Sequence, residues 1–214
     1  MRLGALEESD RGRLREILDA TAVFRPEEVS IALELFDDTL RTAHVGQPPT
    51  AGSRAAASAP LDYEFVGAFA DDGSLIGYAC YGATPATDRT YDLYWIATHP
   101  IAQGSGAGSR LLGEVEQRLR ARNGRLLVVE TSSREEYAPT RRFYTRRGYD
   151  EIARLRDFYA PFDDRVIYTK RLDHTSNGAS RSPGADAHEV RGPKSQSEVR
   201  SVVSPTSRRS SVDE

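Results

Sequence analysis

The sequence has few of the features that mark a secreted or membrane-bound protein. Its 214 residues include a single cysteine, Cys80, so no disulfide bond can form within the chain. No apolar run approaches the roughly 20 residues that a bilayer-spanning helix needs. The first ten residues, MRLGALEESD, turn acidic at once and lack the apolar segment of a signal peptide. We therefore expect a cytoplasmic protein without a membrane partner, in which Cys80 packs within a strand.

An excess of positive charge is also missing. Lys and Arg together number 29 against 32 Asp and Glu, which gives a formal net charge of −3. A surface that follows a phosphate backbone would require a clear surplus of Lys and Arg. Nucleic acid is therefore not an expected partner.

Large apolar residues are absent from the end of the chain. Residues 173–214 contain no Phe, Tyr, Trp, Leu or Ile and are rich in Ser, Arg and Pro. Such a composition buries too little apolar surface to offset the entropy lost on ordering. We predict a disordered tail at 173–214 and a folded domain at 1–172. Residues 46–60 have a similar composition, which predicts a mobile loop inside that domain.

The remaining sequence alternates between helical and extended patterns. The predicted helices are one that is capped by Ser9 or Asp10 and carries Leu14, Ile17 and Leu18, followed by helices at 27–40, 104–122 and 139–147. The predicted strands are 63–70, 74–82, 90–98, 126–131, 151–159 and 165–171. Hairpins followed by strand–helix–strand units indicate an α/β protein with a mixed sheet.

The turn between the third strand and the third helix has an unusual composition. It reads WIATHPIAQGSGAGSRLL and places Gly104, Gly106 and Gly108 within five positions where a helix begins. Each glycine destabilises a helix by about 1 kcal/mol relative to alanine, so the cluster needs another explanation. Glycine lets an anion approach the backbone N–H groups, and the first N–H groups of a helix have no partner within it. The turn therefore predicts a phosphate-binding site.

The glycine spacing narrows the choice of phosphate ligand. The turn lacks the Gly-Lys-Ser/Thr of a triphosphate loop, and Ser109 interrupts the GxGxxG of a dinucleotide site. Gln103, Gly106 and Gly108 instead form Gln-x-x-Gly-x-Gly, which resembles the acetyl-CoA pyrophosphate motif of the GNAT acetyltransferase superfamily. A later segment, YAPTRRFYTRRGYDEI, also resembles a motif of that superfamily through its Phe-Tyr and Gly-Tyr pairs.

The resemblance spans about residues 3–172 and implies a fold, a co-substrate and an activity. The implied GNAT fold has a mixed central sheet of six to seven strands, two of them parallel and splayed apart, and about four helices. Acetyl-CoA is the implied acyl donor, no metal is implied, and the implied reaction is acetyl transfer to a primary amine, with a small molecule as the leading choice. The implied coenzyme-binding residues are Ile96, Ala97, Thr98, Gln103, Gly104, Ser105, Gly106, Ala107, Gly108, Ser109 and Thr140.

Two catalytic roles are predicted. The resemblance places Tyr144 beside the coenzyme sulfur, where its phenol would protonate the departing thiolate. Tyr137 and Thr140 stand where many relatives have Asn and Ala, and Thr140 would supply a hydroxyl to pantetheine. Glu130 ends an apolar strand whose end faces the cleft, so it is a candidate general base, a contact to a cationic substrate or a cap of a neighbouring element.

Other residues are predicted to contact the acceptor. Asp92 and Tyr94 share a strand face, and Phe24 lies in the segment from which the resemblance builds the substrate pocket. His99 stands next to Pro100, which favours a role in the loop over catalysis. Two alternative functions remain open, a non-catalytic acyl-CoA-binding module and a protein or peptide N-acetyltransferase. Both a monomer and a homodimer are compatible with the sequence.

Overall fold

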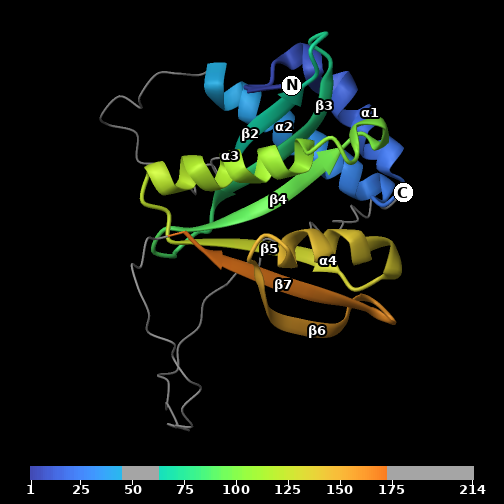
Figure 1. Ribbon diagram of the computed structural model, residues 1–214, viewed down its shortest axis with the longest axis vertical. Coiled ribbons are helices and arrows are strands. Elements are labelled where there is room, and N and C mark those ends of the chain that lie inside the picture. The colour runs from blue at the N-terminus through green and yellow to red at the C-terminus, as the bar shows by residue number, and fades with distance from the viewer. Residues whose placement is uncertain (45–62, 173–214) are drawn as a thin grey trace, which may run out of the picture. The chain divides into compact units, whose positions relative to one another are not determined.

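The structure is a computed structural model that describes residues 1–44 and 63–172. Within these residues it consists of a seven-stranded mixed sheet and four α-helices (Figure 1). The predicted loop at 46–60 and the predicted tail at 173–214 lie outside the described residues. No helix in the described ranges is both long and apolar enough to cross a membrane.

The elements follow one another in the predicted order, and the predicted fold class is confirmed. The α-helices are α1 (Arg11–Thr21), α2 (Pro26–His44), α3 (Ala107–Ala121) and α4 (Ala138–Thr145), and the 3-10 helices are η1 (Glu8–Asp10), η2 (Pro100–Ala102) and η3 (Glu135–Tyr137). The strands are β1 (Arg2–Gly4), β2 (Tyr63–Phe69), β3 (Leu75–Ala83), β4 (Thr90–Thr98), β5 (Leu126–Ser132), β6 (Asp150–Ala160) and β7 (Asp163–Arg171). Their order across the sheet is β1-β2-β3-β4-β5-β7-β6.

Two of the differences from the sequence-based prediction have a clear physical reason. The sequence pattern does not indicate β1, because its three residues are too few to show an alternation; pairing with the end of β2 holds it in the sheet. Helix α3 begins at Ala107 and not at 104. Gly104 and Gly106 adopt φ angles of 79° and 86°, which a right-handed helix does not allow.

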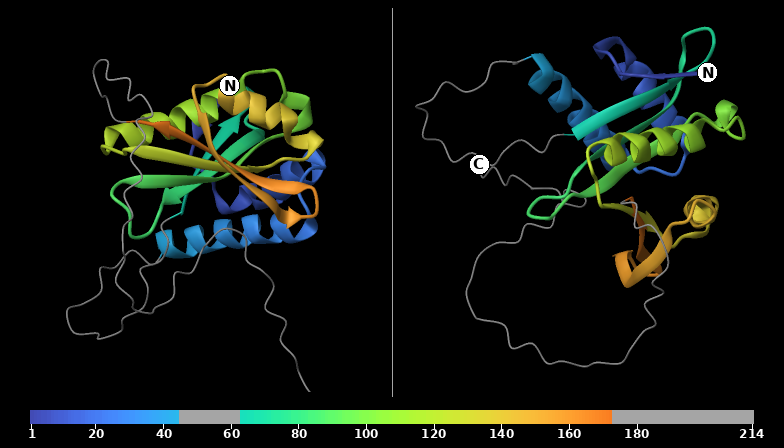
Figure 2. Two further views of the ribbon diagram at one scale, coloured as in Figure 1. Left: turned by 90° about the horizontal axis from the view of Figure 1, so that it is seen from below. Right: turned by 60° about the vertical axis from the view of Figure 1, so that its left-hand side comes forward.

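Apolar side chains form clusters on both faces of the sheet. Helices α3 and α4 cover one face, and α1 and α2 cover the other (Figure 2). The stripe that the sequence predicts on α3 is buried against the first face, and the stripe on α1 is buried against the second. The α3 stripe consists of Leu111, Leu112, Val115 and Leu119, and the α1 stripe of Leu14, Ile17 and Leu18.

The two central parallel strands separate along their length. β4 and β5 pair only from Thr90 opposite Leu126 to Leu93 opposite Val129. Beyond these positions β4 continues to Thr98 along β3, whereas β5 continues to Ser132 along β7. Figure 1 shows the strands meeting at one end and diverging at the other. The splayed parallel strands implied by the family resemblance are present.

β4 contains one residue more than the segment of β3 that it pairs with. Cys80 pairs with Trp95 and Tyr81 pairs with Leu93, so Tyr94 is the additional residue of a β-bulge. A bulge shifts the alternation of a strand by one residue. Leu93 and Ile96 therefore pack on the same apolar cluster although they are three residues apart.

A buried hydroxyl without a partner leads to a prediction about stability. Tyr78 is 0% exposed, and its hydroxyl makes no hydrogen bond within the described residues. We expect Tyr78→Phe to raise the free energy of unfolding by about 1 kcal/mol at pH 7, as measured by urea denaturation, because an unsatisfied polar group is removed. Burial raises the pKa of Tyr78 well above its ordinary value. The unfolded phenol ionises above about pH 10, so wild-type stability falls as pH rises there and the advantage of the variant grows.

Tyr81 provides the matched control. It is equally buried, but its hydroxyl donates a hydrogen bond to Glu64 at 2.9 Å. Tyr81→Phe should therefore lower stability at pH 7. Equal effects of the two substitutions would contradict the explanation.

Candidate functional site

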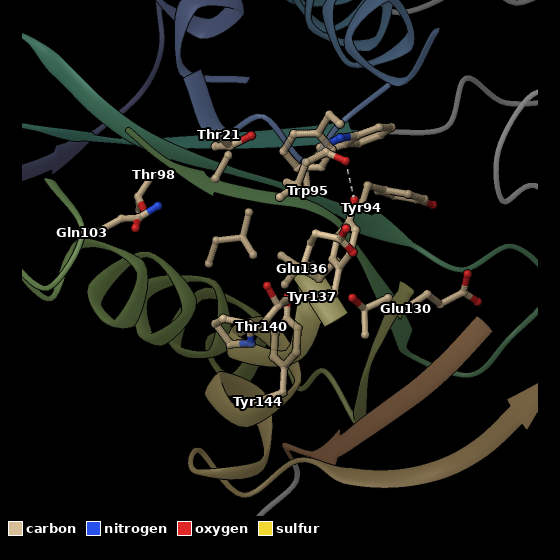
Figure 3. A pocket seen from close by; sticks show the side chains of 17 residues that line it. Thr21, Tyr94, Trp95, Thr98, Gln103, Glu130, Glu136, Tyr137, Thr140 and Tyr144 are labelled. Carbon is tan, nitrogen blue, oxygen red and sulfur yellow. Dashed lines mark hydrogen bonds between the residues drawn. The ribbon is translucent and has the colours of Figure 1, made fainter. Parts of the chain in front are cut away.

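A cavity of about 340 Å³ lies where β4 and β5 diverge. Residues 93–98 of β4 form one wall, and Glu130 and Thr131 of β5 belong to the other. Thr21, Val23 and Phe24, at and after the end of α1, also line it. The η3–α4 segment contributes Glu136, Tyr137, Pro139, Thr140 and Tyr144, and Gln103 contributes from the turn before α3. Figure 3 shows Glu130 and Tyr144 at the cavity from different elements.

The glycine turn presents a group of free backbone donors next to this cavity. The N–H groups of Gly104 and Gly106 make no hydrogen bond within the described residues. Those of Gly108 and Ser109 belong to the first turn of α3, where a helix offers no partner. The N–H of Ala107 is 3.4 Å from the Ser105 hydroxyl, a long contact. The donors and the positive end of the helix dipole together suit an anion.

A guanidinium lies beside the same turn. Arg147 donates a hydrogen bond to the Ser109 hydroxyl, and its charge lies 3.7 Å from the centre of the Phe143 ring. A second hydrogen bond, of 2.9 Å, joins Arg147 to the carbonyl of Phe143. These contacts fix a positive charge at the start of α3, which adds to the attraction for an anion.

The backbone of β4 also directs donors into the gap between the strands. The His99 N–H donates to the Ile76 carbonyl at 2.9 Å, so these residues form a hydrogen-bonded antiparallel pair. Hydrogen-bonded and non-hydrogen-bonded pairs alternate along such strands. Ile96 and Thr98 consequently direct their N–H and C=O groups away from β3, toward the side that β5 has left. The bulge at Tyr94 determines which residues of β4 direct their N–H groups to this side.

Tyr144 is buried in an aromatic cluster and still borders the cavity. It is 3% exposed and packs against Tyr149 and Tyr168, with ring centres 5.5 Å and 6.0 Å away. Its hydroxyl has no hydrogen-bond partner within the described residues. Burial raises the pKa of Tyr144 above its ordinary value, so the phenol stays protonated at neutral pH.

Glu130 is part of an ion pair. Its Oε1 accepts a hydrogen bond from Arg165, and its Oε2 is buried without a partner in the described part of the chain. Asp92 does not line the cavity; its carboxylate accepts a hydrogen bond of 2.7 Å from Thr84. Burial raises the pKa of Asp92, with the Thr84 contact and the charge of Arg165 acting in the opposite direction.

Several contacts join the segment after α1 to the segment after β5 and to the start of β7. The Tyr137 hydroxyl donates to the carbonyl of Val23 at 3.0 Å, a bond drawn in Figure 3. Asp163 is 4% exposed and lies 3.7 Å from Arg25 and 3.4 Å from Arg134. These contacts hold the segment that carries Phe24 against η3 and against the start of β7.

Most residues singled out in the sequence meet at this place. Ile96, Ala97, Thr98, Gln103, Thr140, Tyr144, Glu130, Phe24 and Tyr94 line the cavity, while Gly104, Ser105, Gly106, Ala107, Gly108 and Ser109 form the adjoining turn. His99 lies in the loop, where its Nδ1 accepts the Ile101 N–H at 3.3 Å. Among the cavity residues that sequence reasoning does not assign, Thr131 carries a local signal, because it is a polar residue at the end of an apolar strand. Thr21, Val23 and Glu136 carry none.

Comparison with known proteins identifies a family. The profile described as the acetyltransferase (GNAT) family matches residues 32–149. The chain is 43% identical to a protein of known structure from Desulfovibrio desulfuricans that has been assigned to the GNAT family; the match covers 80% of this chain and 98% of that one, with a TM-score of 0.67. No curated protein matches the chain.

More distant structures share the fold. The ribosomal-protein-S18-alanine N-acetyltransferase from Escherichia coli is 17% identical, with a TM-score of 0.59 over 85% of this chain and 97% of that one. The protein yncA from Salmonella typhimurium, solved with its cofactor acetyl-CoA, is also 17% identical, with a TM-score of 0.59 over 84% of this chain and 98% of that one.

Proposed function

Because the chain belongs to the acetyltransferase (GNAT) family, we propose that it transfers an acetyl group from acetyl-CoA to the primary amine of a small molecule. In this reaction the amine attacks the thioester directly while both substrates are bound. The observation that carries the proposal is the turn of unpaired N–H groups at the start of α3, next to the cavity that Tyr144 lines.

The free donors of the turn fit the pyrophosphate of the coenzyme. Gly104, Gly106, Gly108 and Ser109 would donate to its oxygens, and Arg147 adds a fixed positive charge. The φ angles of Gly104 and Gly106 explain why glycine stands at these positions. Thr98 and Gln103 connect this turn to the cavity, so the acyl end of the coenzyme would enter the gap between β4 and β5.

The N–H groups of Ile96 and Thr98 provide electrostatic stabilisation. Negative charge develops on the thioester oxygen as the amine attacks, and donors that are fixed in advance stabilise such charge most effectively. Both N–H groups face the gap and belong to a strand that β3 holds in place. We assign them as the oxyanion donors.

Two side chains are placed to handle the protons. As the new C–N bond forms and the C–S bond breaks, the amine loses one proton and the departing thiolate gains one. We assign the first to Glu130 Oε2, directly or through a water, because Oε1 is engaged with Arg165. The second comes from the Tyr144 phenol, whose raised pKa keeps its proton in place until charge develops on sulfur.

The size of the cavity favours a small acceptor. The space of about 340 Å³ must hold both the acyl end of the coenzyme and the amine. The contacts from Tyr137 to Val23 and from Asp163 to Arg25 restrict the room for a long peptide. The cytoplasmic location and the oligomeric state stay predictions.

A titration followed by an acceptor screen tests this proposal. Isothermal titration should detect acetyl-CoA binding, and no heat of binding at millimolar coenzyme would contradict it. A panel of small primary amines and a panel of peptides with free N-termini are then compared by detection of free thiol, with amine-free reactions as the background. We expect turnover with members of the first panel; turnover with peptides alone would replace the small-molecule acceptor by a peptide.

A further inference from the structure

Thr131 is a buried hydroxyl residue that satisfies no hydrogen bond in the described structure. It is 6% exposed, and its Oγ1 has no partner. Thr90, near the start of the neighbouring strand, is 7% exposed, but its hydroxyl accepts a hydrogen bond from Arg125 at 3.1 Å. A buried hydroxyl without a partner destabilises a protein, so its presence calls for an explanation outside the free chain.

The position of Thr131 supplies one. It lies on β5 two residues beyond Val129, the last residue of that strand paired with β4, so it borders the gap. Its side chain lines the cavity. Successive side chains of a strand point to opposite faces, so Thr131 shares a face with Leu127 and Val129, which pack in the apolar cluster that includes Tyr144. Glu130 points to the other face.

The two hydroxyls on this face lack partners at the same place. Thr131 Oγ1 is buried without a partner within the described residues. The Tyr144 hydroxyl also makes no hydrogen bond there, and both residues line the cavity. One staggered step about χ1 moves the hydroxyl of a threonine into the place that its methyl group held, and the methyl group into the place of the hydrogen on Cβ. A ligand in the cavity can therefore be reached by the Thr131 hydroxyl without any movement of the backbone.

We propose that Thr131 is a positioning residue whose hydroxyl hydrogen bonds to the acyl-thioester end of acetyl-CoA. This inference rests on the proposed function and deepens it, because it adds a side-chain contact on β5 to the backbone donors of β4. The thioester end is then held between the two splayed strands and not against β4 alone. The cost of leaving the hydroxyl unpaired in the free protein is recovered when the coenzyme binds.

Two substitutions test this role: Thr131→Val removes the hydroxyl, and Thr131→Ser keeps it. Valine keeps the branched shape that suits a strand and removes only the hydroxyl, so the thermal midpoint of the free protein should stay the same or rise. Acetyl-CoA affinity, measured by isothermal titration without amine, should fall roughly 3- to 10-fold. Serine keeps the hydroxyl and should bind the coenzyme within about 2-fold of wild type.

Thr90→Val is the matched control. It removes an equally buried hydroxyl whose partner is Arg125, and neither Thr90 nor Arg125 lines the cavity. We expect a lower thermal midpoint and unchanged acetyl-CoA affinity. The two valine substitutions should thus move stability and binding in different combinations.

The outcomes separate this inference from the proposal beneath it. If wild type binds acetyl-CoA and Thr131→Val binds it equally well, the positioning role is wrong. A change in the KM for the amine alone would not rescue it. A serine variant as weak as the valine variant contradicts it too. A wild-type protein that binds no acetyl-CoA overturns the proposed function, and this inference with it.

Discussion

Gly106→Val is expected to weaken acetyl-CoA binding severely while the protein remains folded. Gly106 has a φ of 86° just before α3, and a β-branched residue there is strained even though nothing lies within 4 Å of an added Cβ. The new side chain would occupy the space over the free N–H groups, and the strain would redirect them. Since hydrogen bonds to charged groups contribute about 1.5–3 kcal/mol each, losing two of them should reduce affinity roughly 100-fold or more. Isothermal titration measures this change.

Gly113→Ala is the control within the same helix. Gly113 lies inside α3, and an added Cβ meets nothing within 4 Å. Alanine there should raise the free energy of unfolding by about 0.5–1 kcal/mol, because it lowers the entropy of the unfolded chain and favours the helix. Coenzyme affinity should not change. If Gly106→Val bound acetyl-CoA as tightly as Gly113→Ala, the turn would not be the pyrophosphate site.

Tyr144→Phe should lower kcat about 100-fold and leave acetyl-CoA affinity nearly unchanged. The substitution removes the proposed proton donor to the thiolate and keeps the ring that packs against Tyr149 and Tyr168. Since the Tyr144 hydroxyl has no partner within the described residues, its removal should not lower stability. Steady-state kinetics with saturating amine, together with a titration of the coenzyme, separate the effect on turnover from the effect on binding.

Tyr149→Phe is the control for this experiment. Its hydroxyl donates to Glu116 at 3.0 Å and does not border the cavity, so its loss should reduce stability by about 1 kcal/mol and leave kcat unchanged. The pH dependence adds a second check. Burial raises the pKa of Tyr144, so its ionisation should not reduce wild-type kcat below about pH 10. Unchanged turnover in Tyr144→Phe would remove the proton-donor assignment.

The elements could be predicted from the sequence wherever their signal is local and repeated. Spacing of apolar residues along α1 and α3 predicts which faces are buried, and the alternating segments predict six of the seven strands found in the described residues. β1 escapes this reasoning because three residues show no period. The predicted start of α3 is wrong because a pattern of apolar residues does not report backbone φ angles, and the positive φ of Gly106 prevents the helix from beginning before Ala107.

Some features of the candidate site could likewise be predicted from the sequence, and others could not. The proposed roles of Gly106 and Gly108 follow from neighbouring residues, since a turn and the first N–H groups of a helix are properties of one short segment. The partner of Glu130 does not follow, because Arg165 is 35 residues away and reaches it only through the pairing of β5 with β7. The contact between Tyr137 and Val23 joins positions 114 residues apart.

The sequence by itself predicted the acyl donor, because the turn that we propose to bind phosphate is contiguous and its φ angles are ones that glycine adopts readily. The tertiary structure decided what surrounds the reacting end. It set the direction of the Ile96 and Thr98 N–H groups through a bulge at Tyr94. It also left Thr131 without a partner in the described residues. Both depend on where strands from separate parts of the chain pair and where they part, and no local pattern of residues encodes that geometry.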